Sequence, residues 1–197
     1  MNLSSTLNSE IIRIFATILL PGVLTLLSLA MLFCAFHFPN NAAMLDWLSE
    51  NAETVGKHST VLTVFFFILA VGGGILAETI GARFEYHICD WRANKSCDNF
   101  SDVWNKYLTL KFEHDPIGQK YLRYLHLHLK FELNFAAAVL LVAISVGFMD
   151  WNFKDTSVHW LFYTVCGVGA AALLWESVSS SINLHNVRKQ LVEKYDT

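Results

Sequence analysis

The chain alternates long apolar stretches with polar segments. Four stretches are mainly apolar, and they cover about residues 11–38, 61–82, 131–149 and 158–181. A helix needs roughly 20 predominantly apolar residues to cross a bilayer, because backbone polar groups must all be paired within the hydrocarbon core. The pattern therefore predicts an all-α integral membrane protein, with four transmembrane helices in a single membrane domain that covers residues 1–197.

The composition agrees with extensive lipid contact. Hydrophobic residues make up 54% of the chain and charged residues 16%, whereas a soluble domain carries about 25% charged residues. With a net charge of −3 and no nucleic-acid-type basic patch, the chain is expected to bind no DNA. The four cysteines form no CxxC pair, so reduced thiols are expected. The sequence offers no motif from which a cofactor or a bound metal would be predicted.

Lysine and arginine are distributed unevenly between the connecting segments. Eight lie between the second and third apolar stretches, three in the C-terminal tail and one near the N-terminus, whereas the other two connections hold only Lys57 and Lys154. Connections rich in Lys and Arg remain in the cytoplasm. We therefore expect a multi-pass protein of a bacterial inner (cytoplasmic) membrane, with both termini, a helical region over about 83–130 and a tail over 182–197 in the cytoplasm.

Helical patterning continues beyond the apolar stretches on this expected cytoplasmic side. Apolar stripes follow the second and fourth stretches, at Phe84, Ile88 and Trp91 and at Leu184, Val187, Leu191 and Tyr195. Ser101 is expected to cap a short helix, and Asp115-Pro116 to begin a long helix that runs on into the third span. We expect helices two, three and four to project from the membrane into a cytoplasmic helical bundle.

Two local features of the spans and loops are also informative. Pro21-Gly22 predicts a kink in the first span. In the outer loop, residues 43–48 form a short amphipathic turn that predicts an anchor on the membrane surface, with a signalling or ligand-binding role as the alternative.

Four carboxylates lie near the expected cytoplasmic ends of the spans: Glu78, Glu85, Glu132 and Glu176. Ionisable groups at membrane depth are costly and face a partner or a water-filled cavity. They are candidates for an ion or proton site or a gate. The structural alternative is pairing with Arg13, Arg83 or Lys130. His128 lies one helical turn before Glu132, which raises the further possibility of a pH-sensing pair.

Small residues cluster in the second and fourth spans. Candidates for helix packing or an oligomer interface are Gly72, Gly73, Gly74, Gly81, Gly167 and Gly169. Small residues let helix backbones approach closely within a bilayer. The pattern is compatible with packing inside one subunit and with a homo-oligomer, and we expect a homo-oligomer.

A weaker alternative is a membrane-embedded, metal-dependent hydrolase or nuclease that uses Glu78, Glu85 and His87. Its other candidate residues are Asp90, Arg123, His126 and His128. His126 and His128 are two positions apart, so on a helix they point about 200° apart and are poorly placed to bind one metal ion. The string from Arg123 to His128 resembles the R-x4-H core of HEPN ribonucleases, in which the Arg and His cleave RNA, although Tyr124 replaces the polar residue often found after the Arg.

In its layout of four spans and cytoplasmic helices, the chain resembles small multi-spanning membrane effectors of bacterial phage-defence and CRISPR-associated systems. The resemblance implies an antiviral defence protein that forms an ion channel or pore, or perturbs the bilayer, when its cytoplasmic part binds a protein or a signalling ligand. A membrane scaffold that binds another protein is a further alternative. The sequence thus favours an effector over an enzyme.

Overall fold

The computed structural model describes residues 15–93, 100–110, 117–153 and 160–195. The secondary structure in these ranges is helical. In chain order the elements are the π-helical turn η1 (Phe15–Leu19) and the α-helices α2 (Leu20–His37), α3 (Asn41–Lys57), α4 (Ser59–Ala93), α5 (Phe100–Thr109), α6 (Ile117–Phe153) and α7 (Trp160–Tyr195).

Four helical segments are long and apolar enough to cross a membrane: Phe15–His37, Ser59–Ile88, Tyr121–Phe153 and Trp160–Tyr195. They overlap the four stretches predicted from the sequence, so the chain is a multi-pass, all-helical membrane protein. Helices α4, α6 and α7 contain 35, 37 and 36 residues. At 1.5 Å per residue each is about 50 Å long, more than the ~30 Å hydrocarbon core. The predicted continuation of these helices beyond their apolar parts is confirmed.

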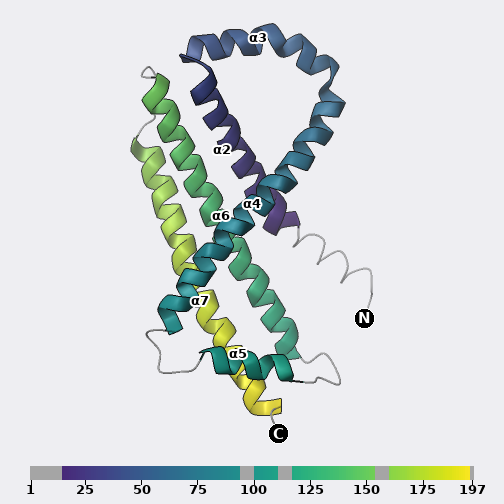
Figure 1. Ribbon diagram of the computed structural model, residues 1–197, viewed down its shortest axis with the longest axis vertical. Helices are drawn as coiled ribbons and strands as arrows, with labels where there is room; N and C mark the ends of the chain where they lie inside the picture. The colour runs from purple at the N-terminus through teal and green to yellow at the C-terminus, as the bar shows by residue number, and fades with distance from the viewer. Residues whose placement is uncertain (1–14, 94–99, 111–116, 154–159, 196–197) are drawn as a thin grey trace.

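The helices form an elongated bundle with one cross-piece at each end (Figure 1). Helix α3 lies at one end, and α5 lies across α7 at the other. Helices α6 and α7 run antiparallel along each other, while the first turn of α2 crosses the middle of α4. Helices α2 and α6 run toward the α3 end, and α4 and α7 run away from it.

Helices α2 and α4 cross at a point where glycine is required. A Cβ atom on Gly22 would overlap the carbonyl oxygen of Ala70, and one on Gly74 would overlap the carbonyl oxygen of Ile18. Beyond this crossing, residues 59–69 of α4 diverge from the other helices and are exposed around the whole helix. This segment is the apolar run that includes Phe65, Phe66 and Phe67, and such a surface is suited to lipid.

The interruption at Pro21 is accommodated by a change of helix type. Pro21 lies in the first turn of α2, directly after the π-helical turn η1. Proline has no N–H, so the carbonyl of Thr17 loses its α-helical donor. The Asn134 side-chain nitrogen of α6 lies 3.5 Å from that carbonyl oxygen. The sequence-predicted irregularity is therefore a π-helical turn beside α6.

Helices α4, α5, α6 and α7 pack around one apolar cluster at the α5 end. Its buried members are Leu122, Leu125, Leu129, Leu133, Leu184 and Leu191, with Phe84, Ile88, Tyr107, Leu174 and Val187 against them. The predicted helical bundle is thus present as a packed unit. Its location in the cytoplasm stays a prediction from the charge distribution.

Three local predictions differ from the structure or lie outside it. The expectation that Ser101 caps the short helix was wrong, because α5 begins one residue earlier, at Phe100. Asp115 and Pro116 lie outside the described residues, and α6 is described from Ile117. The outer loop is more ordered than the predicted short turn, because α3 has 17 residues and Asn40 caps it by accepting a hydrogen bond from the Ala43 N–H at 2.8 Å.

Candidate functional site

A row of buried polar side chains lies where α6 and α7 pack together. On α6 it contains Glu132, and on α7 it contains Ser177, Ser180, Ser181, His185 and Arg188. Apart from the adjacent Ser180 and Ser181, the α7 residues follow one another at steps of three or four residues, so they lie on one face of the helix. The buried polar residues elsewhere in the described spans are uncharged (Thr17, Thr25, Ser28, Asn134 and Ser145), so the ionisable members of this polar α6–α7 seam need a specific explanation.

Glu132 is the most unusual member of the seam. Its side chain is 2% exposed, and a weak hydrogen bond from the Ser180 hydroxyl on α7 reaches its carboxylate. The Glu176 carboxyl, also on α7, acts on its charge from across the seam. A buried carboxylate with such weak support is costly when ionised, so this position suits a bound proton or another positive charge.

His128 connects this buried carboxylate with the surface. Its Nδ1 atom lies 3.5 Å from Oε1 of Glu132, one helical turn away, and its side chain is 42% exposed. His128 also lines an open groove between η1 and α6, together with Ala16, Thr17, Tyr124, Leu127 and Phe131. The pairing of His128 with Glu132, suggested by their spacing, is therefore present, and one side of the imidazole faces the groove.

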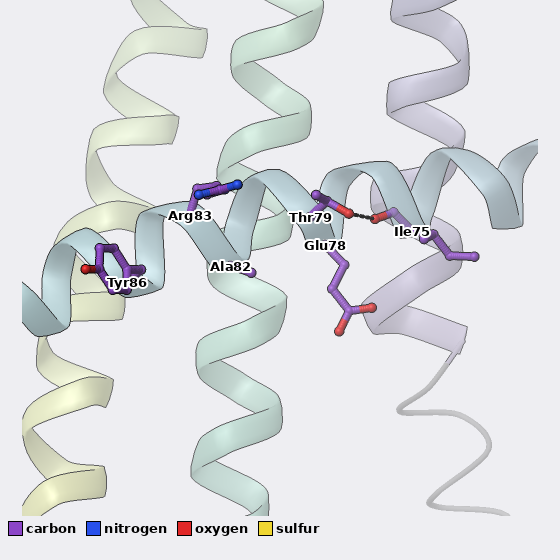
Figure 2. Close-up of a pocket in the computed structure, with 6 residues that line it drawn as sticks. All are labelled: Ile75, Glu78, Thr79, Ala82, Arg83 and Tyr86. Atoms are coloured by element: carbon purple, nitrogen blue, oxygen red, sulfur yellow. Dashed lines mark hydrogen bonds between the residues drawn. The ribbon is translucent and has the colours of Figure 1, made fainter. Parts of the chain in front are cut away.

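Glu78 is satisfied by an ion pair. Its Oε1 atom lies 2.8 Å from Nζ of Lys130 on α6, and the two side chains are 38% and 34% exposed. Lys130 was one of the partners expected in the structural alternative. Glu78 also borders an open groove along α4, together with Ile75, Thr79, Ala82, Arg83 and Tyr86. Figure 2 shows that Glu78 and Arg83 extend to opposite sides of α4, so they do not face each other.

Glu85 interacts electrostatically with His126 of α6, not with Glu132. It contributes to the electrostatic environment of His126, together with Lys130 and Arg188. The Nδ1 atom of His126 is buried without a hydrogen-bond partner among the described residues. The guanidinium carbon of Arg188 lies 4.0 Å from the centre of the Trp104 ring, which joins α5 to α7. The four predicted carboxylates are thus distributed over several partners, and Glu132 and Glu176 are the pair that acts across the seam.

The residues of the metal or nuclease alternative do not come together. Among the side chains that the structure describes, no three His, Cys, Asp or Glu residues are placed to hold a metal ion. His126 and His128 have different neighbours, as their spacing predicted. Arg123 is exposed and lies five positions before His128, which places the two about 140° apart on the helix. His87 contacts the ring of Tyr86, and the side chain of Asp90 lies outside the described part.

The predicted glycines divide into two groups. Gly73 and Gly74 lie against η1 and α2, and Gly81 lies against Asn134 of α6, so these three serve packing within the subunit. In contrast, Gly72, Gly167 and Gly169 have open space where a Cβ would be. These outward positions are the ones that remain available to a second subunit or to lipid.

Sequence reasoning missed Asn134 and the polar residues of α7. The sequence held a signal for the α7 residues, because they repeat at helical spacing: Ser177, Ser180, Ser181, His185 and Arg188.

Comparison with known proteins identifies no relative: no family model, curated protein sequence or solved structure matches the chain.

Proposed function

We propose that the chain is the subunit of a homo-oligomeric, channel-like effector of a bacterial inner membrane, which lets protons or other cations cross. The observation that supports this proposal is the α6–α7 seam, in which the Glu132 carboxylate is buried near the end of a span with only weak support from the Ser180 hydroxyl among the described residues. Ionisable groups in spans are rare and costly, and those that occur often mark ion or proton pathways.

The proposed control element is the packed unit at the α5 end, which the charge distribution assigns to the cytoplasm. Helix α5 contacts α7, and the contact between Arg188 and Trp104 joins it to the same helix that carries the polar row. A protein or a signalling ligand that moved α5 would therefore act directly on α7. The resemblance in layout to phage-defence effectors gives this control a purpose: sensing of infection would increase the open fraction of the channel above the basal fraction that strong production reveals.

Oligomerisation is the second component of the proposal. Two faces have no partner among the described residues of the subunit. One is the apolar surface of residues 59–69 of α4, and the other is the small-residue face of α7 at Gly167 and Gly169. Such faces are suited to close contact between helices of neighbouring subunits. A scaffold that binds another membrane protein would use the same faces without conducting ions.

The experiment is strong induction of the chain in bacteria loaded with a potential-sensitive dye. We expect loss of membrane potential and growth arrest with the natural sequence, and their absence with Glu132→Gln. Glu53→Gln is the matched control, because Glu53 is an exposed carboxylate of α3 paired with Lys57. Normal potential and growth under strong induction of the natural sequence, with the protein in the membrane fraction, would contradict the proposal.

A further inference from the structure

We infer that Glu132 is a proton-binding site, loaded from the groove between η1 and α6 through the imidazole of His128. This inference rests on the proposed function only where it concerns proton movement across the membrane. The loading step depends on the geometry around Glu132 alone.

The surroundings of Glu132 suit a proton better than a metal cation. Metal ions such as Mg²⁺ and Ca²⁺ need about six oxygen ligands, and in the described chain no cluster of three acidic, histidine or cysteine side chains is available for one. A proton needs only one oxygen. Leu129 and Leu133, both almost fully buried, adjoin Glu132 on α6, and such apolar surroundings favour the neutral acid over the carboxylate.

His128 is placed to deliver this proton. Its Nδ1 lies 3.5 Å from Oε1 of Glu132, slightly beyond hydrogen-bond length, while its half-exposed ring borders the groove. A hydronium ion in the groove gives its proton to Nε2 of the imidazole and becomes water, and the imidazolium passes the Nδ1 proton to Oε1. Glu132 becomes the neutral acid and His128 returns to neutral imidazole, so charge and protons balance. Imidazole is suited to this relay, because one ring nitrogen can accept a proton while the other donates one.

The charged groups that act on Glu132 are few. On α6 it is His128, and on α7 it is Glu176, with the Ser180 hydroxyl beside them. On α4, Glu78 is held by Lys130 and Glu85 acts on His126. Glu176, which acts on Glu132 from α7, is exposed.

The primary test is infrared difference spectroscopy of the full-length protein in lipid nanodiscs, recorded between acidic and alkaline pH. A neutral carboxylic acid has its own carbonyl-stretch band. We expect a band that titrates with pH, disappears in Glu132→Gln and shifts in Glu132→Asp. The band should persist in Glu78→Gln and in Glu53→Gln. Persistence of every pH-dependent carboxylic-acid band in Glu132→Gln would overturn the assignment. So would displacement of the band by Na⁺ or K⁺ at constant pH, which would indicate a metal cation.

A second measurement keeps the test valid if Glu132→Gln fails to fold. His128→Gln keeps the carboxylate and removes the relay, so after a pH jump the Glu132 band should appear at least tenfold more slowly but reach the same amplitude. An unchanged rate would overturn the relay through His128. Proton flux into liposomes is then measured on the same preparations. A Glu132 band with the expected behaviour, but no flux in the natural sequence, would leave the proton site standing and remove the proposed channel.

Discussion

Nζ of Lys130 lies 2.8 Å from Oε1 of Glu78, and this ion pair joins α6 to α4 across 52 positions of the chain. Both side chains are about one third exposed, so solvent screens the attraction. Loss of the pair should cost about 1 kcal/mol or less, as is usual for exposed pairs. The contact explains why Glu78, although it lies within a span, need not be a functional carboxylate.

A charge-swap series measures this pair. Lys130→Glu places two carboxylates together and should lower the thermal unfolding temperature in detergent, and Glu78→Lys should do the same. The double variant Glu78→Lys, Lys130→Glu should recover most of the loss, because the pair is restored with its charges exchanged. If the two single effects simply add in the double variant, the ion pair does not contribute to stability.

The three consecutive glycines of α4 provide a test of the α2–α4 crossing. Gly74→Ala would place a Cβ against the backbone of Ile18, and should destabilise the protein by about 1–3 kcal/mol because packed helices must move apart. The Cβ of Gly72→Ala would lie in open space. This substitution should leave stability unchanged or raise it slightly, since alanine favours helix. Thermal unfolding in detergent compares the two. Equal effects would show that the helices do not cross at Gly74.

The different surroundings of Gly72 and Gly74 illustrate what the sequence could and could not predict. The four spans, and the pairing of His128 with Glu132 one turn apart, depend on local patterns, and both were predicted. The partner of Glu78, and the choice of Gly73, Gly74 and Gly81 for internal packing, depend on how distant helices meet. A single sequence holds no record of that register, so the carboxylates and the glycines could be proposed only as sets.

The contact between Trp104 and Arg188 should control how firmly α5 is held. The Arg188 guanidinium lies over the ring at 4.0 Å, and cation–π contacts of this kind contribute about 0.5–1 kcal/mol at exposed sites. Trp104→Leu keeps apolar volume but removes the aromatic face, and it should raise the rate of protease cleavage around α5 by roughly two- to fivefold. Trp104→Phe retains an aromatic ring, so its cleavage rate should lie between those of the natural sequence and Trp104→Leu. Cleavage at the natural rate in Trp104→Leu would show that this contact does not hold α5.

The outward glycines of α7 lead to a prediction about assembly. Gly167 and Gly169 have open space at the Cβ position, so leucine at either site should leave the subunit folded. If this face forms the subunit interface, Gly167→Leu and Gly169→Leu should prevent close approach of the helices and weaken association at least tenfold. The control is Gly147→Leu on α6, which also has open space at its Cβ and should leave the assembly intact. Mass measurement in nanodiscs or mild detergent distinguishes the outcomes. If the natural sequence is an oligomer that keeps its mass in both α7 variants, its interface lies elsewhere, and the fully exposed part of α4 becomes the next surface to test.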